Sequence, residues 1–190
     1  MSQVDIADKT FLKSDFSDIK IEAGEYENCI FRNCNFSSAD LSNIRFSSCI
    51  FEACNLSNSR LTNTSFREAR FKNCKILGLH FEHCNEFLFS VEFEDCNLAL
   101  SSFYKRKLKK TRFVNCILKE TDFTETDLTD SLFDCCDLER SVFDHSILEK
   151  ADFRTSWNYT IDPESNRLRK AKFSREGLAG LLEKYDLRIE

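Results

Sequence analysis

The sequence predicts an all-β solenoid with four sides per coil, closed at its C-terminal end by a short α-helix. Three observations predict this fold: an apolar residue at every fifth position, like residues at every twentieth position, and an amphipathic C-terminal segment. Neither the 3.6-residue period of a helix nor the two-residue period of a strand produces a five-residue period. The 190 residues include 19 Phe and 10 Cys but only 4 Gly and 1 Pro, so conventional hairpin turns should be few.

The five-residue period runs through two stretches, residues 6–81 and residues 88–153, and the register slips by two residues within 82–88. Two positions before each apolar centre the residue is usually small, and the remaining three are mostly polar. Each five-residue unit therefore sends one bulky and one small side chain inward before the chain turns a corner. We assign residues 4–155 to the solenoid and residues 156–190 to a C-terminal cap.

Residues of one kind recur twenty positions apart when the slip is counted as two extra residues. One such column is all Phe, and another is all Cys. The Cys column consists of Cys34, Cys54, Cys74, Cys96, Cys116 and Cys136. Opposite charges also recur at this step, as in Arg32 and Glu52, whereas a step of fifteen places Arg45 on Arg60. Neighbouring coils favour like apolar residues and opposite charges in register, so we predict four sides rather than three.

The Cys column has two interpretations. Adjacent coils lie about 4.8 Å apart, a distance compatible with the Cα spacing of a disulfide, so a redox or metal module is one alternative. A line of parallel thiols does not converge on one tetrahedral zinc ion, however. Cys also packs in cores as a small hydrophobe. We favour a structural column with no metal and no cofactor, and we expect Cys135, which leaves the inward register, to be exposed.

Several segments carry a recurring motif. They are ADLSN (39–43), CNLSN (54–58), TDLTD (126–130), CDLER (136–140) and ADFRT (151–155). This A(D/N)LXX pattern resembles that of pentapeptide repeat proteins, which implies a right-handed quadrilateral β-helix. The tail is similar to the caps of the quinolone-resistance branch (Qnr, MfpA). In that branch the cap joins two rods into a dimer, and the protein binds DNA gyrase and topoisomerase IV by imitating duplex DNA. Gram-negative Qnr proteins also carry two large loops, whereas this chain has only a two-residue insertion.

The cap can be described from its own residues. Ser174 is a suitable N-cap, and the apolar residues that follow share one helical face. We predict that the cap and dimer residues are Phe173, Leu178, Leu181, Leu182, Tyr185, Leu187 and Ile189. Phe173 continues the Phe column, and Leu187 and Ile189 form a short extended pair for a partner subunit. A monomer whose helix only covers the core is the alternative.

Residues 120–139 form an acidic segment. It contains eight acids and no Lys or Arg, and Lys119 and Arg140 flank it. We predict a partner-binding acidic surface that consists of Asp122, Glu125, Asp127, Asp130, Asp137 and Asp144. Three of these acids, Asp122, Asp137 and Asp144, have no basic residue twenty positions away. The rod, residues 1–155, has 20 basic and 26 acidic residues. This net charge is small for a DNA mimic, so a surface of ordinary salt-bridged rungs is the alternative.

Two irregular segments have alternative interpretations of their own. The segment HFEHC (80–84) offers His80, Glu82, His83 and Cys84 to a metal ion, although a solvated strand end explains it equally simply. The basic segment YKRKLKK (104–110) places Arg106 in an inward position that is normally small. A buried cation needs partners, so we expect the coil to bulge there. The segment either binds a phosphate or acid, or only pairs with acids of the next coil.

Composition and motifs exclude several functions. The chain has no GxSxG elbow, P-loop, HExxH or dinucleotide fingerprint, and its net charge of −5 disfavours direct nucleic-acid binding. It lacks the apolar run of roughly 18 residues that a membrane helix needs, and its first residues do not resemble a signal peptide. We therefore expect a cytoplasmic, non-catalytic binding protein with reduced cysteines. The first hypothesis is a Qnr- or MfpA-like ligand of DNA gyrase or topoisomerase IV that confers fluoroquinolone resistance. A generic protein-interaction scaffold is the alternative.

Overall fold

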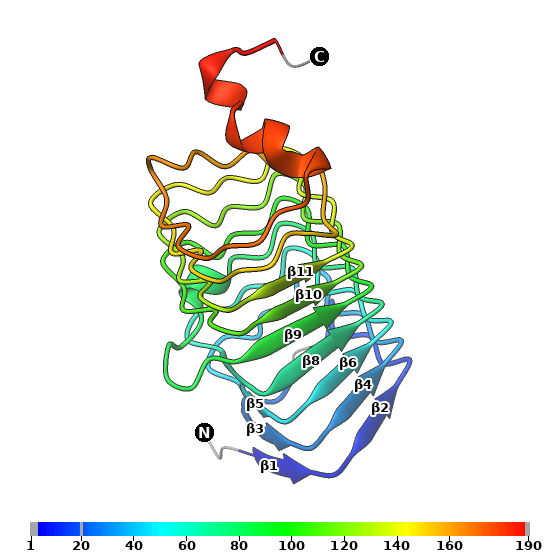
Figure 1. Ribbon diagram of the computed structural model, residues 1–190. Helices are drawn as coiled ribbons and strands as arrows, with labels where there is room; N and C mark the ends of the chain where they lie inside the picture. The colour runs from blue at the N-terminus through cyan, green and yellow to red at the C-terminus, as the bar shows by residue number, and fades with distance from the viewer. Residues whose placement is uncertain (1–3, 20, 189–190) are drawn as a thin grey trace.

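The computed structural model describes residues 4–19 and 21–188. The chain rises as a coil from the N-terminus to a cap at the opposite end (Figure 1). Parallel pairing joins the strands into a four-stranded sheet, β1-β3-β5-β7, and a seven-stranded sheet, β11-β10-β9-β8-β6-β4-β2. The strands are β1 (Val4–Ala7), β2 (Thr10–Leu12), β3 (Gly24–Glu27), β4 (Ile30–Arg32), β5 (Arg45–Ser47), β6 (Ile50–Glu52), β7 (Ser65–Arg67), β8 (Ala69–Lys72), β9 (Val91–Glu94), β10 (Arg112–Val114) and β11 (Leu132–Asp134).

The register of these strands confirms the twenty-residue coil. Phe31 pairs with Phe51, and across the slip Phe71 pairs with Phe93, twenty-two positions on. The Phe rings stack in a column that continues to Phe173, with centroids 5.4 Å from Phe153 to Phe173. Isolated parallel bridges continue the same step outside the two sheets. The predicted four-sided solenoid is therefore confirmed.

The corners of the coil explain why so few glycines are needed. Every fifth residue along the regular coils has a positive φ, and many of these residues are Asn. The asparagines are Asn28, Asn33, Asn43, Asn58, Asn63, Asn73, Asn115 and Asn158. Asn tolerates the left-handed conformation better than most non-glycine residues because its short amide bonds locally. Each corner then lets the next unit send its bulky side chain inward.

Many of the small inward residues, those with a hydroxyl or thiol, are hydrogen-bond donors as well as fillers. Thr126 Oγ1 donates to the carbonyl of Phe103, 2.8 Å away on the coil below. Ser146 Oγ donates to Phe123 in the same way at 2.7 Å. The thiol of Cys54 occupies the same position and lies 3.2 Å from the carbonyl of Phe31. This position therefore takes a small side chain that can satisfy a buried carbonyl.

The slip forms a loop that leaves the side of the rod before β9 (Figure 1). A short 3-10 turn, η1 (Phe81–His83), precedes it. Our expectation that the inward register resumes at Leu88 is wrong, because Leu88 adopts a corner conformation with φ 57° and is 62% exposed. Phe89 packs against the core instead, with its ring centroid 6.3 Å from that of Phe81.

The cap differs from the predicted α-helix. It consists of two 3-10 segments, η2 (Glu176–Leu181) and η3 (Glu183–Tyr185). Tyr159, only 4% exposed, covers the last coil, and its ring lies 5.6 Å from that of Phe173. The cap lies so close to Tyr159 that a Cβ added to Gly180 would sit 2.0 Å from the Tyr159 carbonyl oxygen. Glycine also disfavours a continuous α-helix.

The predicted apolar face of the cap is only partly used. Phe173 and Leu181 are partly buried against the core, and Ser174 Oγ accepts a hydrogen bond from the Gly177 N–H at 3.1 Å. The other cap residues that the structure describes are exposed, namely Leu178, Leu182, Tyr185 and Leu187. The expectation of one buried helical face is therefore wrong, because Tyr159 already fills the space above the last coil. Ile189 lies outside the described residues.

Candidate protein-interaction surface

The predicted acidic residues are spread over three sides of the rod instead of sharing one face. Isolated β-bridges between neighbouring coils form columns, and each column follows one side of the coil. Three of the acidic residues belong to three different columns. The bridges are Asp122–Val142, Asp127–Ile147 and Asp137–Trp157. Asp122 and Asp127 stand one five-residue unit apart, and Asp137 follows two units later, so the three sides differ. We call the six residues Asp122, Glu125, Asp127, Asp130, Asp137 and Asp144 the acidic girdle.

Ion pairs reduce the charge of the girdle. Glu125 lies 3.4 Å from Lys105, and Asp130 lies 3.8 Å from Lys150. Asp127 pairs with Lys109 at 3.1 Å. The twenty-residue step predicts Lys107 as the partner of Asp127, but the structure pairs Asp127 with Lys109 instead. Such exposed pairs contribute little stability, but they do lower the electrostatic field of the surface.

The expectation that Asp137 has no basic partner on the next coil is also wrong. Lys119 Nζ lies 3.1 Å from Asp137 and 2.7 Å from Glu139, because a long side chain reaches acids that flank its own column. Burial opposes ionisation of Asp137, but hydrogen bonds from Asn158 and Lys119 outweigh it and lower the pKa of this carboxyl.

The remaining two girdle acids have no Lys or Arg partner among the described residues. Asp144 Oδ2 lies 2.9 Å from the ring of His145, a pair that is ionic only when the imidazole is protonated. Asp122 Oδ1 accepts a hydrogen bond from the Thr124 N–H in its own turn at 2.8 Å. Asp122 is therefore the girdle carboxylate whose charge is least compensated.

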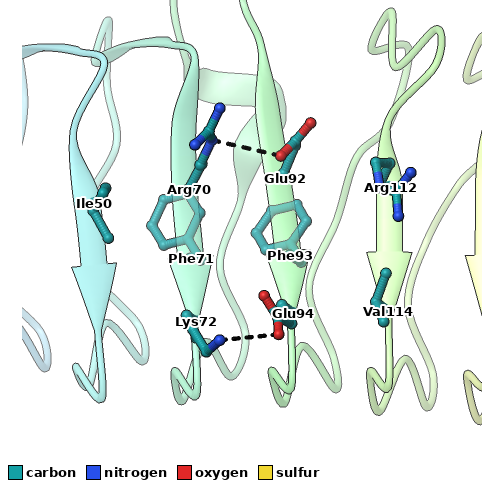
Figure 2. Close-up of a pocket in the computed structure, with 9 residues that line it drawn as sticks. All are labelled: Ile50, Arg70, Phe71, Lys72, Glu92, Phe93, Glu94, Arg112 and Val114. Atoms are coloured by element: carbon teal, nitrogen blue, oxygen red, sulfur yellow. Dashed lines mark hydrogen bonds and ion pairs between the residues drawn. The ribbon is translucent and has the colours of Figure 1, made fainter.

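A shallow groove on the seven-stranded sheet shows how completely other charges are paired (Figure 2). The groove has a volume of about 420 Å³ and lies over strands β6, β8, β9 and β10. Within it Arg70 pairs with Glu92 at 3.6 Å, and Lys72 pairs with Glu94 at 3.0 Å. Both carboxylates that line the groove are thus in ion pairs between neighbouring strands, while Arg112 lies beside them without a partner drawn in Figure 2. This arrangement suits a solvated surface better than acid–base chemistry.

The Cys column lies where the sequence predicts it. All six thiols are buried and free, and Cys135 is exposed. The neighbouring Cys74 thiol and burial raise the pKa of Cys54. A protonated, buried thiol is a poor nucleophile and a poor metal ligand. The geometry therefore favours the packing and carbonyl-bonding role described above.

The segment 80–84 does not gather its polar groups around one point. His80 Nδ1 lies 2.8 Å from Glu82 Oε1, whereas Cys84 is buried and burial raises the pKa of its thiol to about 12. Within residues 4–19 and 21–188, no group of three or more His, Cys, Asp or Glu residues is placed to hold a metal ion.

Arg106 is buried without the bulge that we expected. It is 3% exposed, and its coil keeps the regular turn, with the Arg106 N–H bonded to the Phe103 carbonyl at 2.9 Å. The guanidinium enters the widened coil below, where Nε donates to the carbonyl of Phe81 at 2.8 Å. The sequence does contain a signal for this contact, because Arg106 lies twenty-two positions after Cys84, directly above the slip.

In the described part of the chain, no helix is long and apolar enough to cross a membrane. A search of the curated proteins found no match to this chain. Among solved structures, two trypsin-treated forms of QnrB1, a plasmid-mediated fluoroquinolone resistance protein, are similar. Each has 22% identity and covers 97% of this chain and 99% of its own, with TM-scores of 0.50 and 0.51.

HetL from the cyanobacterium Nostoc sp. strain PCC 7120, a pentapeptide repeat protein involved in heterocyst differentiation regulation, is also similar. It has 14% identity and a TM-score of 0.51, and the match covers 89% of this chain and 86% of HetL. At these identities the likenesses show a shared fold. The sequence profile of the pentapeptide repeat region matches residues 25–86 and 87–157, most of the chain, and the protein therefore belongs to the pentapeptide repeat family.

Proposed function

We propose that this protein is a non-catalytic, cytoplasmic binding protein whose rod engages a type II topoisomerase, DNA gyrase or topoisomerase IV, in the place of duplex DNA. The observation that carries the proposal is the acidic girdle. Its six carboxylates surround three sides of the C-terminal half of the rod, as phosphates surround a duplex. The resemblance of the tail to Qnr and MfpA supports the choice of partner.

The girdle would act mainly by steering the encounter. A negative surface accelerates association with a basic DNA-binding groove, and the effect weakens as salt screens the charges. Because ion pairs compensate several girdle acids, Asp122 and Asp144 contribute most of the uncompensated charge. Binding should therefore depend strongly on these two residues and on ionic strength.

The test is a gyrase supercoiling assay in which the protein is titrated with and without a fluoroquinolone. We expect inhibition of supercoiling, rescue from the drug, or both. The double variant Asp122→Lys/Asp144→Lys should lose the effect, whereas the control Glu27→Lys/Asp95→Lys, which makes the same change in net charge outside the girdle, should retain it. Equal activity of both double variants would contradict the girdle mechanism, and no effect of the wild type at micromolar concentration would contradict the choice of partner.

A protein-interaction scaffold with another target is the second candidate. The observation that favours it is the extensive ion pairing of the rod surface, as in the groove over β8 and β9, where Arg70 and Lys72 neutralise the acids of the next strand. A surface of this kind has a weak long-range field. Affinity purification with the wild-type rod as bait, compared with the girdle double variant, would then recover a partner whose binding is independent of Asp122 and Asp144.

The exposed cap is proposed as the contact between two copies of the chain. Leu182 and Leu187 border a concavity of about 420 Å³ on the cap, which Ala179, Gly180, Glu183 and Asp186 also line. Exposed apolar side chains around a concavity are typical of a protein–protein contact. Two rods joined at this end would form an elongated dimer with a girdle on each half.

A further inference from the structure

A buried charge without a counter-ion lies beside the inserted loop. Arg106 is almost completely buried, and the cost of burying a cation is large unless it is compensated. Its guanidinium donates to three backbone carbonyls, those of Phe81, Glu82 and Cys84. These carbonyls are neutral acceptors, and within the described chain Arg106 makes no ion pair with a carboxylate.

One edge of the guanidinium remains available. The group has five N–H donors. Nε donates to Phe81, and Nη2 donates to both Glu82 and Cys84, which accounts for three of them. For the two donors on Nη1, no acceptor is found among the described residues. The ring of Phe89 covers one face of the group, with its centroid 5.1 Å from Cζ.

A small cavity adjoins this arginine. Its volume is about 90 Å³, and it is lined by Glu86, Phe89, Lys105, Arg106 and Lys107. Lys105 is compensated by Glu125 at 3.4 Å, whereas no ion pair of Lys107 is found in residues 4–19 and 21–188. Two uncompensated cations therefore face one carboxylate, that of Glu86, so the cavity is positive on balance.

We propose that this cavity binds a small inorganic oxyanion of the phosphate or sulfate class, held by Arg106 and Lys107. The cavity is larger than the space that one water needs. Guanidinium groups match the geometry of tetrahedral oxyanions, and ammonium groups add a mobile point charge. Glu86 and Phe89 of the inserted loop line the cavity together with residues 105–107 of the next coil, so the bound anion fills the space where the loop meets the rod.

The test is calorimetric titration of the full chain with inorganic phosphate at constant ionic strength, with chloride as the compensating salt. We expect saturable binding to the wild type. Lys107→Gln should weaken the affinity by about tenfold, because it removes one hydrogen bond to a charged group. Glu86→Gln should strengthen it, because the repelling carboxylate is removed. Lys110→Gln, a loss of the same charge in the same segment but outside the cavity, should leave the affinity unchanged.

Hydrogen exchange gives a second readout that does not depend on calorimetry. Phosphate should slow exchange in residues 85–90 of the wild type and not of Lys107→Gln. The proposal is overturned if chloride changes the calorimetric heat and the hydrogen-exchange rate of residues 85–90 as much as phosphate does, because that result indicates screening alone. It is also overturned if the response is unsaturable and the same in Lys107→Gln and Lys110→Gln, which is the general stabilisation expected from excluded salts.

Discussion

At the scale of single residues, the coil depends on the inward position that precedes each apolar centre by two. Many of the side chains there are small and donate to a carbonyl of the coil below, although Ala69 and Ile44 fill the same position without a donor. Arg106 obeys the same rule, because its Nε donates to Phe81 from the place where Thr126 Oγ1 donates to Phe103. A long side chain is tolerated only where the slip has widened the coil beneath it.

Replacing Thr126 by Val tests this rule at nearly constant volume. The change removes one of the two hydrogen bonds that the buried Phe103 carbonyl accepts, since the Arg106 N–H remains its other donor. The free energy of unfolding should therefore fall by about 1 kcal/mol. Urea denaturation monitored by circular dichroism measures this difference. Thr124→Val, on the outward side of the same turn, is the matched control and should change stability much less. A loss as large in Thr124→Val would mean that the exchange of a hydroxyl for a methyl group in general, rather than the missing hydrogen bond to Phe103, sets the cost.

The buried thiols predict how stability responds to alkaline pH. Burial raises the pKa of Cys49 from 9.0 to about 12. The folded protein therefore keeps a proton that the unfolded chain loses above pH 9, and stability falls as pH rises through the window between these values. At pH 10 this one thiol should cost about 1.4 kcal/mol relative to neutral pH.

Urea midpoints of the wild type and of Cys49→Ala, measured from pH 7 to pH 10.5, check this prediction. The variant should lose less stability than the wild type over the same range, even if it is less stable at pH 7. Parallel curves for the two proteins would show that the Cys49 thiol is not the group responsible.

At the scale of structural elements, the cap is held by a close fit to Tyr159 and not by an apolar helical face. In Gly180→Ala the new Cβ would meet the Tyr159 carbonyl oxygen, only 2.0 Å from its ideal position. Although Ala favours helices, the overlap should lower the stability of the cap by about 1–3 kcal/mol. Limited trypsin digestion should then cleave the variant faster after Arg175 and Lys184. The exposed Leu178, changed to Ala, is the control, and equally fast cleavage of both variants would contradict this account.

The repeating elements could be predicted from the sequence because each coil repeats the same evidence. Phe, Cys and opposite charges recur every twenty residues. This spacing determines the number of sides, the inward residues and the position of the slip. The irregular elements offer no such repetition. Whether Leu88 or Phe89 points inward depends on which residue turns the corner, and the sequence pattern alone chose Leu88 wrongly. The step of five from Phe153 leads to Asn158, but Asn158 turns a corner with φ 59°. Tyr159 is therefore the residue that enters the core.

For the candidate surface, the sequence predicts which acidic residues are present but not how all their charges are paired. The ion pairs of Asp127 and Asp137 were not predicted, because long side chains such as that of Lys119 reach beyond their own column. The distribution of the girdle over three sides also follows from four-sided geometry and could have been worked out from the step of five. The anion cavity required the fold itself, since it joins residues of two coils.

At the scale of the whole molecule, the two ends of the rod differ. Among the described residues, β1 and β2 are the end strands of their sheets in the first coil (Figure 1), whereas Tyr159 and the cap lie at the last coil. Leu12 near the first end and Leu187 in the cap are each 58% exposed. They therefore offer equal apolar area to a second copy of the chain, and only their surroundings distinguish them. Leu187 borders a concavity with Leu182, which a second cap can fill.

Leu187→Asp should consequently convert a dimer into a monomer, because it replaces an apolar contact with a third carboxylate beside Glu183 and Asp186, and a buried carboxylate needs a partner. Sedimentation equilibrium at micromolar concentration should give twice the chain mass of 22.2 kDa for the wild type and the single mass for the variant. Leu12→Asp introduces the same charge at an equally exposed position of the opposite end and should remain dimeric. If Leu12→Asp alone becomes monomeric, the rods associate through their first coils, and a wild type of single mass would contradict association at either end. The position of the contact decides whether the two girdles of a dimer lie close to its centre or near its ends, and thus how long a stretch of a partner's groove the dimer can occupy.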